Sequence, residues 1–208
     1  MKASEEERRS KSLPHRSCLW YERAGEDALC RLCPHACRIS PGGVGRCLVR
    51  KNDPHHGFIS LNDGQAAAIA VDPMEKKPLY HFHPGTHILS LGTVGCNMGC
   101  PFCQNWPLAT GVPSVELVPI EPPDVEQILQ RHSLRSVAFT YNEPSVWYEF
   151  VLRCAQYLKE RGYFVVLVTN GMMCSAPLRA LLPYIDAANV DVKAFSEEHY
   201  TFLGGSLQ

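Results

Sequence analysis

The sequence predicts an α/β fold with a parallel sheet, and two features of its second half carry that prediction. From His87 onward, short apolar runs suited to strands alternate with polar loops and with segments suited to helices. One apolar run, residues 164–168, is continuous, as in a strand that is covered on both faces. The repeated order of strand, loop, helix and strand favours right-handed β-α-β units, whose strands run parallel.

Four strands are expected in this sheet. Each is a short apolar run that ends at glycine or at polar residues. The expected strands cover residues 88–92, 136–141, 164–168 and 188–193.

The helix between the second and third strands has the strongest local signals. Pro144 suits its first turn, where the missing N–H is not needed, and Gly162 suits its end. Shorter helices are expected over residues 178–184 and from Ser196. Four residues of the long helix recur at i, i+4, i+7 and i+11 and are expected to form one buried stripe: Trp147, Val151, Cys154 and Leu158.

The first half of the chain has a different character. Residues 1–17 are polar and are expected to form a flexible tail. Residues 18–86 are expected to form a small cysteine-rich subdomain with a connector, and residues 87–208 the α/β core. Within the first of these, residues 58–61 and 66–71 are expected to pair as a hairpin. The pair Lys76-Lys77 is expected to lie in a solvated loop, and contact with an anionic substrate or partner is the alternative.

Charge and hydropathy exclude several classes of protein. Twenty basic and 21 acidic residues leave a net charge of −1, which indicates no nucleic-acid partner. No apolar run approaches the roughly 18 residues of a membrane-spanning helix, and the N-terminus lacks the apolar segment of a secretory signal. We therefore expect a cytoplasmic protein with no membrane partner.

The chain has ten cysteines, and most of them fall in two groups. In a chain without an export signal, grouped cysteines indicate metal ligands before disulfides. The first group offers four thiols in the pattern C-x2-C-x3-C-x9-C, which would close a tetrahedral zinc site, the simplest interpretation. A second iron–sulfur cluster is the rival, a site without metal is the third alternative, and His35 could replace one ligand. The four cysteines are Cys30, Cys33, Cys37 and Cys47.

The second group, Cys96, Cys100 and Cys103, forms a C-x3-C-x2-C triplet directly after a predicted strand. Three thiolates can bind three irons of a cubane cluster, and the next cysteine, Cys154, belongs to the buried stripe. One iron would then keep an open position, as catalytic metal sites do. The alternatives are a plain electron-transfer cluster and a structural zinc site. Three histidines could supply the fourth ligand of such a zinc site: His81, His83 and His87.

The triplet and the segments around it resemble the radical S-adenosylmethionine (SAM) enzymes. Within them, the sequence is similar to the AmmeMemoRadiSam-system branch, which is close to the pyruvate formate-lyase activating enzymes. The resemblance extends from about Cys18 to the last residue. Besides the triplet, it is carried by residues 72–82, 90–93, 103–106 and 138–144.

The resemblance implies a partial (β/α) barrel of the radical SAM type, preceded by the cysteine-rich metal-binding subdomain. About four β/α units are present before residue 208, and relatives continue past this point. We therefore expect an incomplete barrel and a fragment or truncated isoform.

The resemblance also implies roles for single residues. The triplet would ligate a [4Fe–4S] cluster, whose fourth iron would chelate the amino and carboxylate groups of SAM. Most of the other residues follow strands at their carboxyl ends, where β/α barrels build their sites. They are Phe102 near the adenine, Glu143 as acceptor for the SAM ammonium, Asn170 and Asp191 at strand ends, and Lys193 near the SAM carboxylate or ribose.

The implied reaction begins with one electron passing from the reduced cluster to SAM. Methionine and a 5′-deoxyadenosyl radical result, and the radical abstracts hydrogen from a substrate that the sequence does not identify. The implied partners are an electron donor such as flavodoxin or ferredoxin, and Memo-like and AMMECR-like proteins. The alternatives are a truncated, catalytically inactive iron–sulfur or zinc-binding scaffold and a zinc-only structural protein.

Overall fold

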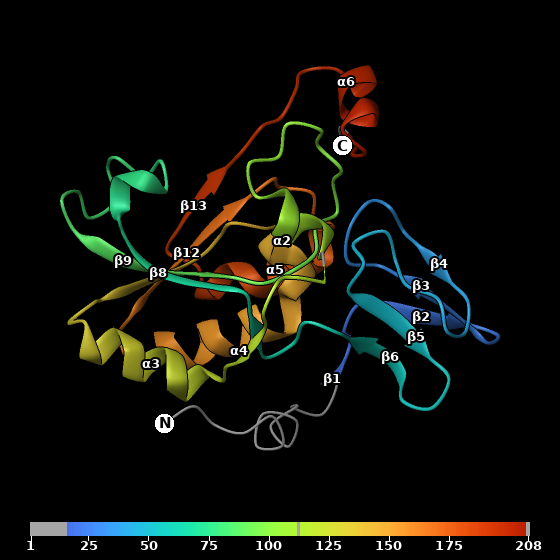
Figure 1. Cartoon of the computed structure of the whole chain (residues 1–208), viewed down its shortest axis with the longest axis horizontal. Coiled ribbons are helices and arrows are strands. Elements are labelled where there is room, and N and C mark those ends of the chain that lie inside the picture. Colours follow the sequence, from blue (N-terminus) through green and yellow to red (C-terminus); the bar gives the residue numbers. More distant parts are fainter. Residues whose placement is uncertain (1–15, 112, 207–208) are drawn as a thin grey trace.

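The computed structural model describes residues 16–111 and 113–206, and its centre is a five-stranded sheet in the order β13-β12-β11-β9-β8 (Figure 1). Four neighbouring strands of this sheet run parallel, which confirms the predicted α/β arrangement. Each begins within one residue of its predicted start. These strands are β9 (His87–Gly92), β11 (Ser136–Phe139), β12 (Phe164–Thr169) and β13 (Ala187–Val190).

The fifth strand, β8 (Ala68–Pro73), pairs antiparallel with β9, so the hairpin expected from the sequence is wrong. The other expected arm, β6 (Gly57–Ser60), pairs instead with β5 (Arg50–Asp53) and with β1 (Arg16–Ser17). The rest of the predicted tail, residues 1–15, lies outside the described residues.

The segment expected to turn between the two arms is held by the core instead. Trp147 Nε1 donates to Asn62 O at 2.7 Å, and Arg153 Nη2 pairs with Asp63 Oδ1 at 3.0 Å. Asn62 and Asp63 are both buried by these long-range contacts, so the segment does not form the exposed hairpin turn that we expected.

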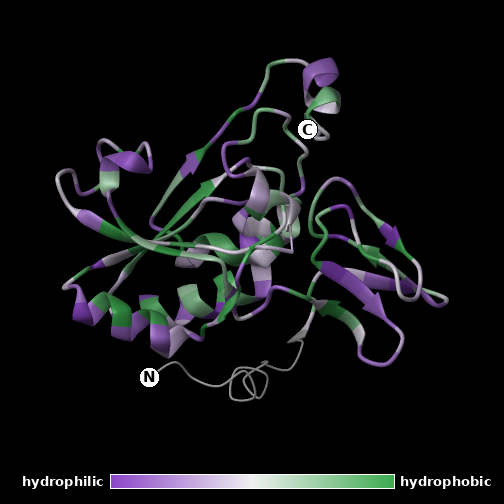
Figure 2. Ribbon diagram, in the orientation of Figure 1, coloured by the Kyte–Doolittle hydropathy of each residue, from purple (hydrophilic) through white to green (hydrophobic). Residues whose placement is uncertain are grey.

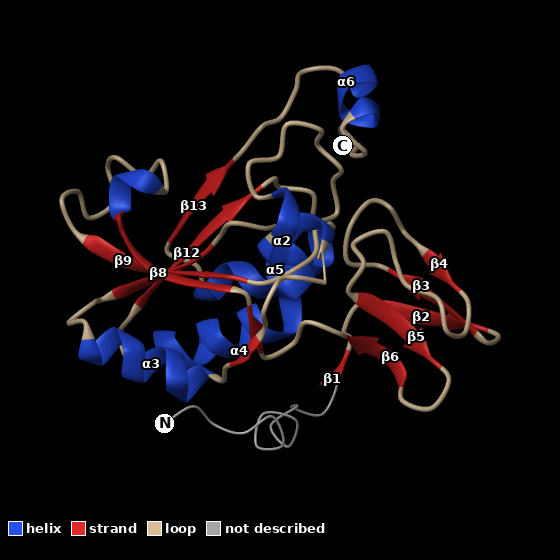
Figure 3. Cartoon of the chain, in the orientation of Figure 1, coloured by secondary structure: helices blue, strands red, loops and turns tan. Residues whose placement is uncertain are grey.

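Helices α3 and α4 lie side by side against one face of the sheet (Figure 3). We did not predict α3, although Asp124 Oδ2 accepts a hydrogen bond from Glu121 N at 2.8 Å in a capping box. The α-helices are α2 (Trp106–Thr110), α3 (Pro122–Arg131), α4 (Tyr148–Lys159), α5 (Ser175–Leu181) and α6 (Glu197–Phe202). The 3-10 helices are η1 (Met74–Lys76), η2 (Pro144–Trp147) and η3 (Leu182–Tyr184).

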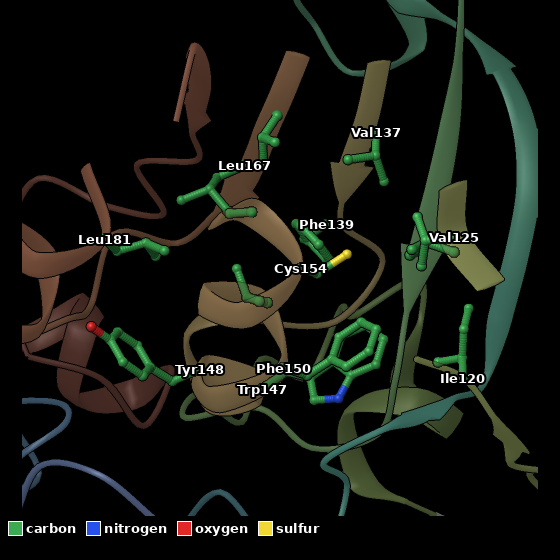
Figure 4. Packing of buried hydrophobic residues seen from close by; sticks show 14 of the residues in the cluster. Ile120, Val125, Val137, Phe139, Trp147, Tyr148, Phe150, Cys154, Leu167 and Leu181 are labelled. Carbon is green, nitrogen blue, oxygen red and sulfur yellow. The ribbon is translucent and has the colours of Figure 1, made fainter. Parts of the chain in front are cut away.

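The core between α4 and the sheet contains the predicted stripe (Figure 4). Pro144 opens η2, which leads directly into α4, and the Trp147 ring stacks on Phe150 with centroids 4.3 Å apart. Figure 2 shows apolar residues concentrated in the central strands. Every member of the stripe is at most 1% exposed: Trp147, Val151, Cys154 and Leu158.

The opposite face of the sheet is covered by the connector that follows β8. Met74 of η1, with Leu79 and Phe82 beyond it, packs against Ile88 and Val166 of the sheet. Coverage on both faces accounts for the continuous apolar run in β12.

The N-terminal part contains two small antiparallel sheets, β2-β3-β4 and β1-β6-β5, which stand to one side of the main sheet (Figure 1). A buried ion pair joins this part to α4, with Arg50 Nη1 3.1 Å from Glu149 Oε1. The remaining strands are β2 (Tyr21–Ala24), β3 (Asp27–Cys30), β4 (Arg38–Ile39) and the paired β7 (Gln65–Ala66) and β10 (Val118–Pro119). Within the described ranges, no helix has the length and apolar character needed to cross a membrane.

Candidate functional site

A cleft of about 540 Å³ lies at the carboxyl ends of the parallel strands. Parallel α/β sheets build their binding sites at this edge, because the loops that follow neighbouring strands meet there. Every residue that we placed in the cluster and SAM site from the sequence lines this one cleft. These residues are Cys96, Cys100, Cys103, Phe102, Glu143, Asn170, Asp191 and Lys193.

The triplet lies in the loop between β9 and α2, and its three thiols are free. Burial, assisted by the nearby Glu143 carboxylate, raises the pKa of Cys96 to about 12. Burial also raises the pKa of Cys100. The protein alone therefore favours neutral thiols at Cys96 and Cys100, and a bound metal would supply the charge that keeps them as thiolates. Three sulfur donors on a cleft with room for another ligand fit an iron–sulfur cluster with an open position.

Two buried asparagines hold the triplet loop. Asn97 Nδ2 donates to Met172 O at 2.8 Å, and Asn97 Oδ1 accepts from Asn170 Nδ2 at 2.8 Å. Asn142 Nδ2 donates to Gly95 O at 2.9 Å. We did not predict either role. The only signals in the sequence were the position of Asn97 beside Cys96 and the position of Asn142 at the end of a predicted strand.

The triplet loop also packs directly on the first cysteine group. Gly95 has φ of +96°, and a Cβ atom there would lie 2.7 Å from Cys47 O and 2.8 Å from Val49 Cγ1. Because both the backbone conformation and the close approach exclude a side chain, only glycine fits at this position.

Glu143 is a buried carboxylate that orients the end of β12. Its Oε1 accepts from Ser145 N at 2.9 Å and from Thr169 Oγ1 at 2.7 Å, and its Oε2 accepts from Asn170 N at 2.8 Å. Burial raises the pKa of Glu143, although these hydrogen bonds act in the opposite direction. A carboxylate has about four acceptor positions, so Glu143 can accept one more donor from a ligand.

The last strand contributes a charged pair to the cleft. Lys193 Nζ donates to Asp191 Oδ2. Burial alone would lower the pKa of Lys193, but the hydrogen bond to Asp191 and the charge of Asp191 raise it. Phe102 lines the same cleft and is 64% exposed, so its ring is free to cover a planar ligand.

The four cysteines of the first group also come together, beside His35 and Arg50, around a cavity of about 10 Å³. Burial raises the pKa of Cys33 to about 12 and raises the pKa values of Cys30 and Cys47. Nowhere in residues 16–111 or 113–206 are three His, Cys, Asp or Glu side chains grouped to ligate a single ion. The first group would therefore need side-chain rotation to close a zinc site, whereas the triplet's sulfurs would surround several irons rather than one ion.

The histidines considered as ligands of the triplet lie elsewhere. His87 begins β9, whereas the triplet follows the end of β9, and a strand of this length spans roughly 20 Å. His83 packs on the ring of Phe164, with centroids 4.4 Å apart. His81 is not among the residues that line the cleft. The zinc alternative for the triplet therefore lacks the fourth ligand that we considered for it.

Comparison with known proteins agrees with this site. Residues 90–206, more than half of the chain, match the Radical SAM superfamily. An uncharacterized protein of Methanocaldococcus jannaschii is 35% identical over 196 residues, which cover 93% of this chain and 58% of that protein.

Two further relatives from the same organism have names that state an activity. A 7-carboxy-7-deazaguanine synthase is 27% identical over 131 residues, or 57% of this chain and 51% of the synthase. A protein provisionally named a glycyl-radical enzyme activating enzyme is 25% identical over 115 residues, which cover 55% of this chain and 43% of that protein. The chain spans about half the length of these curated relatives. Because the superfamily match includes the triplet and all the strand ends that form the cleft, this chain belongs to the radical SAM superfamily.

Proposed function

We propose that the chain binds a [4Fe–4S] cluster through Cys96, Cys100 and Cys103 and cleaves SAM reductively in the same cleft. When bound, these groups supply a 5′-deoxyadenosyl radical that abstracts hydrogen from a substrate. The observation that carries the proposal is the convergence of three free thiols and buried Glu143 on one cleft. Membership of the radical SAM superfamily supports it.

In this proposal the residues of the chain bind and orient the cofactor and exclude water from it. Glu143 accepts from the SAM ammonium at its remaining acceptor position, and Phe102 covers the adenine. Lys193, held by Asp191, directs its charge toward the SAM carboxylate or ribose. Asn170 connects Glu143 to Asn97 and so couples the SAM site to the triplet loop.

The branch and the partners rest on the sequence resemblance. We propose membership of the AmmeMemoRadiSam-system branch, with a flavodoxin or ferredoxin as electron donor and with Memo-like and AMMECR-like proteins as partners. One relative is provisionally named a glycyl-radical enzyme activating enzyme. A glycine of another protein is therefore one candidate substrate.

A catalytically inactive scaffold is the second candidate. A scaffold would bind the cluster without turning over SAM.

The test is anaerobic purification of the chain, analysis of its iron and sulfide, and reduction in the presence of SAM. We expect about four irons at the triplet and formation of 5′-deoxyadenosine. Cys100→Ala should lose both. Cys174→Ala, which changes a cysteine that does not line the cleft, should keep both. Iron without 5′-deoxyadenosine would favour an iron–sulfur scaffold, and zinc without iron would overturn the proposed enzyme.

We also propose a metal at the first cysteine group, with zinc as the simplest occupant and a second iron–sulfur cluster as the rival. The Cys100→Ala variant isolates this site, because it removes the contribution of the triplet. One zinc per chain in Cys100→Ala that is lost in Cys100→Ala/Cys33→Ser would support a zinc site. A residual iron–sulfur absorbance in Cys100→Ala would support a second iron–sulfur cluster. Absence of both metals would contradict the proposal.

A further inference from the structure

One wall of the cleft carries two lysines that the proposed function does not use. Lys76 and Lys77 follow β8 and line the same cleft as the triplet. The expectation of a solvated loop is wrong for Lys77, whose side chain is 3% exposed, whereas that of Lys76 is 61% exposed. A lysine side chain is almost never fully buried unless it is paired, so its placement needs a reason.

Both lysines are anchored on one buried carboxylate. Lys76 Nζ donates to Asp72 Oδ1 at 2.7 Å, and Lys77 Nζ donates to Asp72 Oδ2 at 2.8 Å. The Tyr141 hydroxyl also donates to Asp72 Oδ2, at 2.7 Å. Asp72 therefore fixes three donors that come from two separate segments lining the cleft.

The charges in this group do not cancel. Two ammonium groups share a single carboxylate, which leaves one positive charge on this wall. The other charged residues of the cleft are engaged elsewhere: Asp191 with Lys193, and Glu143 with Thr169 and backbone amides.

The lysines also have donors to spare. An ammonium group has three N–H donors, and Asp72 accepts one from each lysine. The Tyr141 ring faces Lys77, with Nζ 4.8 Å from the ring centroid. These contacts leave at least one N–H of Lys77 and two of Lys76 for a ligand.

The third member, Tyr141, is held in an unusual backbone conformation. Its φ is +73°, and its carbonyl oxygen accepts from Asn105 Nδ2 at 2.9 Å. Bulky residues rarely adopt this conformation, and they keep it where the surrounding structure imposes it. Asn105 lies two residues after Cys103, so the same loop that carries the triplet fixes the tyrosine beside Lys77.

We propose that Lys76 and Lys77, positioned by Asp72 and Tyr141, form a subsite that binds an anionic oxyacid group, a carboxylate or a phosphate, of the substrate. The excess positive charge attracts the anion, and the buried ammonium of Lys77 gives it a charge-assisted hydrogen bond in a place shielded from water. This inference rests on the proposed function, because it takes the cleft as the site of reaction.

The experiment measures binding of inorganic phosphate and of succinate, separately, to the full chain reconstituted anaerobically with SAM present. Isothermal titration calorimetry at constant ionic strength should show saturable binding of at least one probe, and which probe binds distinguishes phosphate from carboxylate. Lys76→Glu should weaken that binding by about tenfold or more, as expected for the loss of one charge-assisted contact. Lys51→Glu is the matched control, since Lys51 also pairs with one aspartate, Asp53, at 2.9 Å, but outside the cleft.

Lys77→Met is the second variant, and its fold is checked by its urea unfolding curve before binding is measured. No saturable binding in the parent chain, or equal binding in Lys76→Glu, would overturn the inference. A loss of SAM affinity in Lys76→Glu, measured by equilibrium dialysis, would also overturn it, because the lysines would then hold the cofactor. Failure of the proposed function appears separately, as absence of 5′-deoxyadenosine from the parent chain while anion binding is still measured.

Discussion

His35 Nε2 lies 2.6 Å from the backbone oxygen of Asn97. His35 stands between Cys33 and Cys37 of the first group, and Asn97 directly follows Cys96 of the triplet. A side chain of one cysteine motif therefore holds the main chain of the other, and the two motifs form one structural unit.

Replacing His35 by alanine should loosen the triplet loop without unfolding the chain. A hydrogen bond of this kind contributes about 1 kcal/mol, so local opening should become about fivefold more frequent. Hydrogen exchange of the amides from Cys96 to Cys100 measures this change. His55→Ala, at an exposed histidine of the N-terminal part, is the control. Unchanged exchange in His35→Ala would mean that the side chain of Asn97 is enough to hold the loop.

Gly95→Ala should destabilise the chain by about 2–4 kcal/mol and abolish iron binding at the triplet. The added Cβ would meet both a carbonyl oxygen and a valine methyl group at less than van der Waals distance, in a conformation that alanine disfavours. Gly85→Ala separates the two effects, because Gly85 has a φ of +76° with nothing within 4 Å of an added Cβ. Urea unfolding and iron analysis measure both variants, and equal losses would show that backbone strain alone is responsible.

Removing only one partner of the ion pair between Arg50 and Glu149 should strongly destabilise the chain. Arg50→Met should lower the free energy of unfolding by about 3–5 kcal/mol, because it leaves a buried carboxylate without its partner. The double variant Arg50→Met/Glu149→Leu should lose much less than the sum of the two single variants. Urea denaturation measures all three. Additive losses would show that the two charges do not stabilise each other. Arg31→Met, in the exposed pair with Glu22, should change little.

Asp72 should make stability depend on pH in the acid range. Burial alone would raise the pKa of Asp72, but hydrogen bonds from Lys76, Lys77 and Tyr141 hold it well below its ordinary value. Below about pH 4 the unfolded chain therefore binds a proton that the folded chain does not, and stability falls as the pH falls. The difference in unfolding free energy between the parent and Asp72→Asn should be largest at neutral pH and shrink on acidification. Urea titrations across this range measure it, and a constant difference would argue against the assignment.

The parts of the fold that the sequence predicted are those set by local pattern. The continuous apolar run of β12 is typical of a covered strand, and its central residues 165–167 are buried. The stripe from Trp147 to Leu158 has the spacing of one helix face, and all four of its members are buried. The gathering of the site residues followed from topology, because parallel strands end at one edge of the sheet. The roles of the individual residues at this site stay predictions.

The features that we did not predict depend on contacts between distant segments. β8 pairs with β9 rather than with β6, and no local turn signal encodes that choice. Lys77 belongs to a polar stretch, and it becomes buried because Tyr141, far along the chain, brings its hydroxyl to Asp72. Neither hydropathy nor spacing along the sequence contains such information.

The contact between Gly95 and Cys47 also has a consequence for biosynthesis. A ribosome makes the chain from its N-terminus, so Cys47 and Val49 emerge well before the triplet. The neighbouring pair β5 and β6 makes short-range antiparallel contacts, which form quickly. We therefore expect β5 and β6 to have had time to pair before the triplet loop reaches them. Arg50 lies on β5, and its ion pair with Glu149 cannot form until the ribosome has synthesised Glu149, 99 residues later. Until then the Arg50 guanidinium stays solvated.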